Sequence, residues 1–413
     1  MRYIHQLDIW PKFVWDHEKI AAFLGLVRNR QGRLVGRMEA MGFALRTEAM
    51  LQTLTLDVIK SSEIEGEILD AQQVRSSIAR RLGLDIAGLI SSDRHVDGVV
   101  DMMLDATQNF NKTLTQDRLC GWHASLFPTG YSGMRKIVAG AWRDDSHGSM
   151  QVVSGPAGHE KVHFEAPEAA RLVREMKDFL NWFNGSTALT MNRVMEIDPV
   201  LEAGIAHLWF VTLHPFDDGN GRIARAITDM QLARADGSAQ RFYSMSAMIR
   251  KERKAYYDVL ETTQKNMHNK SADSGSARPI GIDITAWLEW FLACLDRSLN
   301  LTETALADVF RKARFWELHP AGSLNDRQRM MINKLFEGFE GKLTSSKWAQ
   351  ITKCSQDTAL RDILELLEKG ILVKDFAGGR STNYLLRGIG DVHKNINKHA
   401  KRARGQGERS SKL

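Results

Sequence analysis

The chain has 413 residues, of which 43% are hydrophobic and 26% charged, as in globular proteins with a sizeable core. This composition excludes a collagen-like, fibrous or wholly disordered chain, and the length predicts about two to three domains. No run approaches ~18 consecutive apolar residues, and the N-terminus lacks the apolar stretch of a secretory signal. Three widely spaced cysteines form no CxxC pair. We therefore expect a cytoplasmic protein with reduced thiols and no membrane partner.

The excess of basic residues that gives the formal net charge of +6 is confined to the C-terminal residues. Residues 387–413 hold eight basic and two acidic side chains, so the rest of the chain balances to zero. With few bulky apolar residues, this segment is expected to be a flexible basic tail. A solubilising end without a partner is favoured, and a tether to nucleic acid or an acidic surface stays open.

Most of the chain has helical periodicity, with apolar residues at i, i+3 and i+4. In chain order we expect a strand pair at about Met150–Phe164, helices at Leu172–Asn184, Pro199–Leu213, Ala224–Ala235 and Ala247–Gln264, an exposed loop at Asn266–Gly281, and a second strand pair at Ile371–Leu386. The predicted fold class is mainly α, with strands confined to these two hairpins.

The most informative segment joins two predicted helices and reads Leu213-His-Pro-Phe-Asp-Asp-Gly-Asn-Gly-Arg-Ile-Ala-Arg225. Gly219 and Gly221 can adopt backbone conformations closed to larger residues, so consecutive amides can form an anion nest at the next helix N-terminus. Arg222 and Arg225 lie three residues apart, near one face of its first turn. Two guanidiniums beside such a nest predict a polyphosphate site.

Two further side chains in this segment have matching chemistry. His214 ends the preceding helix and can act as a general base near neutral pH. Asp218 offers a hard oxygen ligand that could hold Mg²⁺ against the same phosphates. The combination predicts nucleotide chemistry at a phosphate. An ordinary helix–loop–helix turn is disfavoured, because most positions have a chemical role.

Residues 214–225 match in full the signature HxFx(D/E)GNGRxxR of the Fic family (filamentation induced by cyclic AMP), which the chain resembles. The resemblance covers about Trp10 to Leu295 and extends to WPKFVWD, SSEIEGEILDAQQVRSSIARRLGLD, MQVVSGPAGHEKVHFEAP, RFYSMSAMIRKERKAYYDVLETTQ and ITAWLEWFLACL. These segments resemble the bacterial subgroup with an N-terminal helical domain. The resemblance implies an all-α core with a β-hairpin flap.

Fic proteins of this kind transfer AMP from ATP to a protein hydroxyl, so the resemblance implies ATP as substrate and Mg²⁺ as cofactor. By similarity, His214 takes the proton of a Ser, Thr or Tyr hydroxyl, Asp218 holds Mg²⁺, and Arg225 binds the γ-phosphate. The nucleotide-binding positions implied are Gly219, Asn220, Gly221, Arg222, Ile223, Ala224 and Arg225. The adenosine is expected near Tyr256 or Tyr257, with plain helix packing an equal alternative for both.

The segment Ser61–Gly66 fits the family's inhibitory pattern (S/T)xxxE(G/N). The resemblance implies that Glu65 pairs with Arg225 and keeps ATP from its productive pose. Glu63 and Glu67 fit less well, because Gly66 directly follows Glu65. By spacing alone, a solvated acidic helix end is favoured; the resemblance favours inhibition.

The stretch around 150–164 resembles the Fic flap, whose edge pairs with a segment of the target protein by β-augmentation. An ordinary surface hairpin is the alternative. The partners implied are therefore the target protein docked on this flap and the chain itself, through auto-modification. A homodimer is left open.

Residues 324–386 predict a helix, a helix–turn–helix and a hairpin, an arrangement that looks like a winged helix. Thr344 can cap a helix at Ser345–Thr352. The second helix, Gln356–Lys369, carries a net charge of −2, which suits phosphates poorly. A protein-contact or dimerisation role is therefore favoured, and Arg380 and the basic tail leave DNA binding open.

Together these features predict an N-terminal helical domain with an inhibitory helix (1–95), a Fic-type catalytic core (96–300), a winged helix–turn–helix (301–386) and a basic tail (387–413). The favoured function is an autoinhibited protein adenylyltransferase. Two alternatives remain: a DNA-binding transcription regulator with a nucleotide-sensing core, and a Fic-type enzyme that uses another nucleotide or removes AMP.

Overall fold

The computed structural model describes residues 2–84, 88–144, 146, 148–155, 159, 161–185, 197–265, 281–319, 323–336, 341–375 and 382–387. The predicted basic tail from residue 388 on, most of the predicted loop (266–280) and both hairpin tips (156–158 and 376–381) lie outside them. The chain divides into two compact units, Met1–Leu306 and Ala307–Leu413. No helix within the described ranges combines the length and apolarity needed to cross a membrane.

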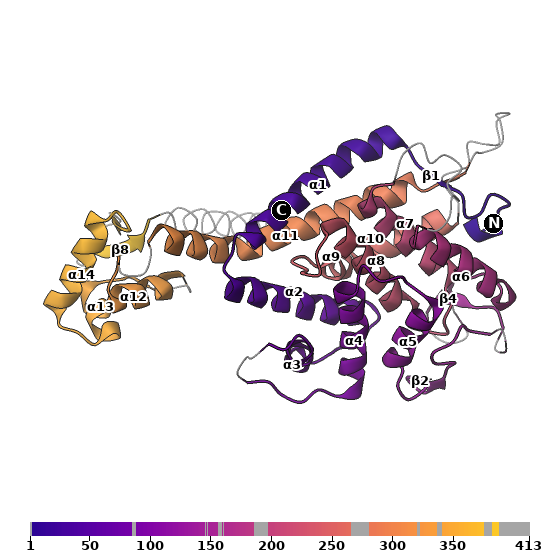
Figure 1. The fold of residues 1–413 in the computed structure, drawn as a ribbon, viewed down its shortest axis with the longest axis horizontal. Coiled ribbons are helices and arrows are strands. Elements are labelled where there is room, and N and C mark those ends of the chain that lie inside the picture. Colours follow the sequence, from indigo (N-terminus) through magenta and orange to yellow (C-terminus); the bar gives the residue numbers. More distant parts are fainter. Residues whose placement is uncertain are drawn as a thin grey trace, which may run out of the picture. The chain divides into compact units, whose positions relative to one another are not determined.

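The first unit is mainly helical (Figure 1). Its helices are α1 (His17–Glu39), α2 (Phe43–Ile64), α3 (Ala71–Arg81), α4 (Arg94–Gln108), α5 (Gln116–Leu126), α6 (Ala169–Phe183), α7 (Pro199–Leu213), α8 (Asn220–Asp236), α9 (Met245–Lys251) and α10 (Arg253–Gln264), with a 3₁₀ turn, η1 (Ile4–Gln6). The long helix α11 (Thr285–Leu318) begins in this unit and ends in the second. Side-chain oxygens cap six of these N-termini, at Asp16, Asp70, Asp93, Thr115, Asp198 and Ser244.

Helices α7 and α8 pack against each other at the centre of this unit, and α8 also packs against α4, α2 and α5. Both helices are buried on nearly every face, which explains why the sequence AHLWFVTL is apolar all round. The segment between them is therefore held from both sides by buried helices.

The two predicted hairpins are confirmed by antiparallel strand pairs. Strand β4 (Gln151–Ser154) pairs with β5 (Lys161–Glu165), and β7 (Leu372–Asp375) pairs with β8 (Asn383–Leu386). The prediction that strands are confined to these hairpins is wrong. Two further pairs occur, β1 (Phe13–Val14) parallel to β6 (Ile282–Asp283), and β2 (Tyr131–Ser132) antiparallel to β3 (Arg135–Lys136). With two residues in each strand, they are too short for alternation to be visible in the sequence.

The predicted helix at 199–213 is confirmed at both ends by α7, and those at 172–184 and 224–235 are confirmed within four residues by α6 and α8. The single helix predicted at Ala247–Gln264 is wrong, because α9 ends and α10 begins at Glu252 (φ −108°, ψ 28°). The apolar spacing continues across this break, so periodicity does not reveal it.

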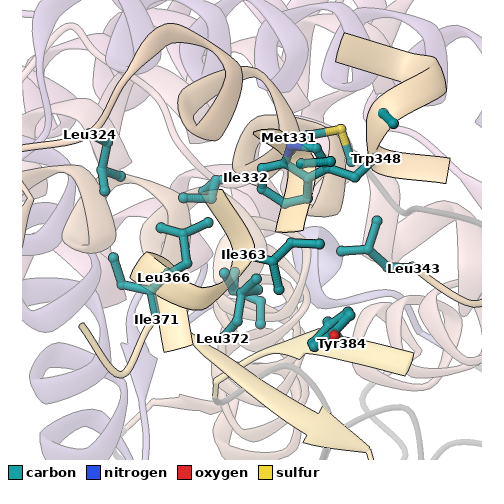
Figure 2. Close-up of a cluster of buried hydrophobic side chains, with 13 residues drawn as sticks. Leu324, Met331, Ile332, Leu343, Trp348, Ile363, Leu366, Ile371, Leu372 and Tyr384 are labelled. Atoms are coloured by element: carbon teal, nitrogen blue, oxygen red, sulfur yellow. The ribbon is translucent and has the colours of Figure 1, made fainter. Parts of the chain in front are cut away.

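The second unit contains α12 (Asp326–Phe336), α13 (Ser345–Thr352), α14 (Gln356–Glu368) and the β7–β8 hairpin. Thr344 caps α13 as predicted. These elements enclose a separate hydrophobic cluster with Trp348 fully buried in it; Figure 2 shows Met331, Ile332, Ile363 and Leu366 among its members. The core of this unit is therefore formed by its own residues.

Candidate functional site

Helix α7 places His214 at its C-terminal end. Asp198 caps the helix, Pro199 occupies its first turn, and the helix ends where His214 adopts the left-handed conformation (φ 48°). Arg143 holds this turn: its Nε donates to the His214 carbonyl at 2.8 Å and its backbone N–H to the Pro215 carbonyl at 2.9 Å. A left-handed backbone is unfavourable for a residue with a side chain. The two contacts from Arg143 hold the His214 backbone in this conformation and thereby position the imidazole.

The imidazole of His214 is half-buried, and its Nδ1 lies 3.3 Å from the Val211 carbonyl oxygen. A carbonyl only accepts, so this contact favours a proton on Nδ1 and leaves Nε2 with a free lone pair. Burial lowers the pKa of His214 to about 4, and the nearby charge of Arg143 acts in the same direction. The neutral imidazole is therefore the form present at physiological pH.

Asn220 closes the loop after His214. Its side-chain amide donates to the Phe216 carbonyl at 2.8 Å, and its oxygen accepts from the Phe216 N–H at 3.0 Å. The Phe216 ring stacks on His123, with centroids 4.2 Å apart. The side chain of Asn220 thus braces the loop, and its backbone N–H belongs to the first turn of α8.

Gly219 and Gly221 shape the N-terminus of α8. Gly219 has φ 76°, and a Cβ there would lie 2.9 Å from the Phe127 ring. A Cβ on Gly221 would lie 2.2 Å from Glu65 Oε1 and 3.2 Å from Arg225 Nη1. Only glycine fits at Gly221 while Glu65 is in place. The first-turn amides of a helix have no intrahelical acceptor and attract anions, and a carboxylate oxygen already lies against this turn.

Asp218 is exposed beside this turn. Its Oδ1 accepts from the Gly219 N–H at 2.6 Å, and its Oδ2 accepts from the Ser132 hydroxyl on β2. Among the described residues, each of these oxygens accepts one hydrogen bond, from a neutral donor, so each retains a lone pair for a cation.

Arg225 is 2% exposed and bound on one side by the end of α2. Its Nε donates to the Ser61 hydroxyl, and its Nη2 donates to both the Ser61 carbonyl and Glu65 Oε1, each at 2.8 Å. Its Nη1 is buried without a hydrogen-bond partner among the described residues. An unsatisfied buried donor is costly, and this one lies over Gly221, where an anion would satisfy it.

The end of α2 explains where Glu65 lies. Gly66 has φ 89°, its N–H donates to the Glu63 carbonyl, and the Glu67 N–H donates to the Ser62 carbonyl. This is the Schellman arrangement, which requires a residue such as glycine at the first position past the helix. The sequence Glu-Gly-Glu thus places one carboxylate on each side of the turn.

Arg222 also pairs with a carboxylate, a contact that the sequence does not reveal. Its Nη1 donates to Glu67 Oε2 at 2.6 Å, and His95 Nε2 on α4 lies 3.2 Å from the same oxygen. Burial raises the pKa of Glu67, but the hydrogen bond to His95 and the charge of Arg222 outweigh it and hold that pKa below its ordinary value. Gly66 is the one available signal, since its turn carries both Glu65 and Glu67 toward α8.

The other predicted site residues are Ile223 and Ala224 on α8 and Tyr256 and Tyr257 on α10. Ile223 and Ala224 are fully buried in the first turn of α8. Tyr256 is 2% exposed, and its hydroxyl lies 2.9 Å from His207 Nε2, so its ring packs in the core. Tyr257 is partly exposed beneath the Arg253 guanidinium, which lies 5.0 Å from its ring centroid and donates to the Ile64 carbonyl near Glu65. Both tyrosines interact electrostatically with Arg225 and Glu65, and Tyr257 is the more exposed of the two.

Comparison with protein families gives two matches. Residues 113–232 match the Fic/DOC family, and this segment includes the whole 214–225 motif. Residues 3–84 match a domain of unknown function, DUF4172, which covers α1, α2 and α3 and therefore Glu65 and Glu67.

Among curated proteins, the chain is similar to protein adenylyltransferase fic-1 of Caenorhabditis elegans (29% identity over 186 residues, 45% of this chain and 33% of that protein). It is also similar to protein adenylyltransferase Fic of Aedes aegypti (29% over 257 residues, 61% and 42%). The chain thus spans about a third to two fifths of the length of these relatives. A Fic family protein from Desulfovibrio desulfuricans G20 has a crystal structure that matches 90% of this chain and 96% of its own, with 21% identity and a TM-score of 0.47.

Proposed function

We propose that this chain is an autoinhibited protein adenylyltransferase that transfers AMP from ATP to a Ser, Thr or Tyr hydroxyl of a protein. The observation that carries the proposal is the carboxylate of Glu65, which lies against Gly221 and Arg225 where a phosphate would bind. Curated relatives named protein adenylyltransferase, at 29% identity, support the same reaction.

In this proposal His214 acts as the general base. Its free Nε2 takes the proton of the target hydroxyl, whose oxygen forms a bond to the α-phosphorus of ATP. The bond from the α-phosphorus to the bridging oxygen breaks, and its electron pair leaves with pyrophosphate. Arg222, Arg225 and the first-turn amides of α8 hold the phosphates, so most of the catalytic effect is positioning and electrostatic stabilisation.

Asp218 would hold Mg²⁺. The described part of the chain contains no cluster of three or more His, Cys, Asp or Glu side chains that could form an all-protein metal site. A single exposed carboxylate beside a phosphate site fits Mg²⁺, which is usually bound by one or two carboxylates together with substrate phosphates and water. When bound, the ion would neutralise phosphate charge.

Ser61, Glu65 and Gly66 form the inhibitory element in this proposal. Glu65 occupies Arg225, and the Schellman turn at Gly66 fixes its position. A γ-phosphate would compete with the carboxylate for the same guanidinium, so ATP would bind productively only when Glu65 moves away. The carboxylate is 31% exposed while Arg225 is 2% exposed, so Glu65 has a path to solvent and the arginine stays in place.

The β4–β5 hairpin is the proposed docking site of the target protein. His163 on β5 links the two strands to α10: its Nε2 lies 2.6 Å from the Ser154 hydroxyl and its Nδ1 lies 2.7 Å from Glu261 Oε2. Within the described part of the chain, β4 and β5 pair with no third strand, so this anchored hairpin could pair with an extended segment of a partner or of the chain itself. For the second unit we propose a winged-helix module that contacts protein rather than DNA, because α14 is acidic.

The test is intact-mass measurement after incubation with ATP, GTP, UTP or CTP. We expect Glu65→Gly to gain an AMP adduct about tenfold faster than wild type, a change that corresponds to 1.4 kcal/mol of relieved competition. His214→Ala in the same background should lose about 10²- to 10⁴-fold, the usual contribution of a general base. No adduct with any nucleotide would contradict the reaction, and equal rates for Glu65→Gly and wild type would contradict the inhibition.

A further inference from the structure

Glu67 has a contact that neither the reaction nor the Glu65 inhibitory pattern requires. Its Oε2 accepts from Arg222 Nη1 at 2.6 Å, and His95 Nε2 lies 3.2 Å from the same oxygen. Glu67 lies in the turn after α2, and its two partners come from two other elements, the first turn of α8 and the first turn of α4. Because residues from two other elements bind it, the Glu67 carboxylate is part of the packed structure and is not a solvated surface charge.

The position of Glu67 is unfavourable unless it has cationic partners. Glu65 and Glu67 flank the C-terminus of α2, the negative end of the helix dipole, where carboxylates are destabilising. Two carboxylates at this end of a helix are locally unfavourable, and locally unfavourable residues are expected at functional sites. The cost is offset only because both carboxylates face the positive N-terminus of α8, where Arg222 and Arg225 lie.

Arg222 is fixed in place, whereas Glu67 is able to leave. The arginine is 2% exposed, has the Phe127 ring 5.1 Å from its guanidinium, and has a buried Nε without a partner in the described residues. The side chain of Glu67 is 36% exposed. A buried guanidinium needs an anionic partner, and a phosphate could take the place of the Glu67 carboxylate at Nη1.

We propose that Glu67 is a second phosphate-competing carboxylate: it occupies Arg222, as Glu65 occupies Arg225, so that the turn 65–67 must release two arginines before a nucleotide triphosphate binds both. This inference rests on the proposed function for the identity of the ligand. Removing Glu65 alone then leaves one of the two phosphate-binding arginines still paired. His95 acts as a positioning residue, because its hydrogen bond keeps Glu67 aimed at Arg222.

The test measures ATP affinity by isothermal titration calorimetry in the full chain, with no turnover required. Glu67→Gln keeps the shape of the side chain and removes its charge. We expect it to tighten ATP binding about tenfold, both alone and in the Glu65→Gly background. The matched control is Glu63→Gln, one turn away, whose carboxylate pairs with Lys60 and Arg250 instead; its ATP affinity should equal that of wild type.

Two further variants keep the result interpretable. Glu67→Asp keeps the charge but moves it away from Arg222, so it should tighten ATP binding less than Glu67→Gln does. If circular dichroism shows that Glu67→Gln does not fold, Glu67→Asp serves as the test variant. His95→Gln should move ATP affinity in the same direction as Glu67→Gln.

The opposite results would overturn the proposal. If Glu67→Gln weakens ATP binding, Glu67 orients Arg222 for the ligand instead of competing with it. If it binds ATP as wild type does, the contact is structural. Failure of the proposed reaction is distinguishable, because Glu65→Gly would then give no AMP adduct while the affinities still report on Glu67.

Discussion

At the residue scale, His214 owes its position and its protonation state to groups outside the motif. Arg143 donates to its carbonyl and contributes to the lowered pKa, while burial is the larger cause. Because the folded-state pKa is lowered to about 4, the neutral form that can accept a proton persists well below the ordinary titration range of histidine.

This gives a prediction on pH. In the Glu65→Gly background, the labelling rate should stay level as pH falls through 6.5 and should decline only toward about pH 4. Replacing Arg143 by Met removes a positive charge, so the pKa of His214 should rise and the acid limb should move to higher pH. Arg143→Lys should move it less.

The measurement is the pH profile of kcat/KM, with circular dichroism at each pH to confirm folding. A uniform loss of rate in Arg143→Met without movement of the acid limb would show that Arg143 acts on structure alone.

At the element scale, close packing of α4 against α5 is set by Gly98. A Cβ there would lie 1.8 Å from the Ser125 carbonyl oxygen, a backbone atom that cannot move aside without moving α5. Gly25 on α1 offers a matched control, because a Cβ there meets nothing within 4 Å.

We therefore expect Gly98→Ala to lower the free energy of unfolding by about 1–3 kcal/mol or more, since overpacking forces backbone shifts. Gly25→Ala should raise it by about 0.5–1 kcal/mol, because alanine is the better helix former. Urea denaturation measures both, and a neutral Gly98→Ala would contradict the close approach of the two helices.

At the scale of the whole molecule, the site and the second unit have separate cores. Every residue proposed to bind ATP lies within 1–306, whereas Trp348 belongs to the cluster shown in Figure 2. Domains with their own cores are able to unfold separately.

Trp348→Ala should therefore destabilise the second unit by about 3–5 kcal/mol, the usual cost of deleting a buried aromatic side chain. The AMP-labelling rate of the Glu65→Gly background should be unchanged within twofold. Differential scanning calorimetry, with labelling measured below the first transition, checks this. A large loss of labelling would contradict the independence of the two units.

The sequence by itself determined the parts of this protein that depend on neighbours along the chain. The periodicity of 199–213 and 224–235 predicted α7 and α8, and glycine and alternation predicted the hairpin at 150–164. Each signal extends over fewer than about twenty residues, within which helical and strand periods are readable.

Only the tertiary structure decided which charges meet. Glu67 and Arg222 are 155 residues apart, and Arg143 and His214 are 71 apart. The first pairing depends on how α2, α4 and α8 pack, and the second on how the segment after β3 lies against the end of α7; no local period encodes either. Spacing alone predicts that the acidic end of this helix is solvated. In the folded chain its two carboxylates pair with two buried arginines, because packing removes the water that would otherwise screen these charges.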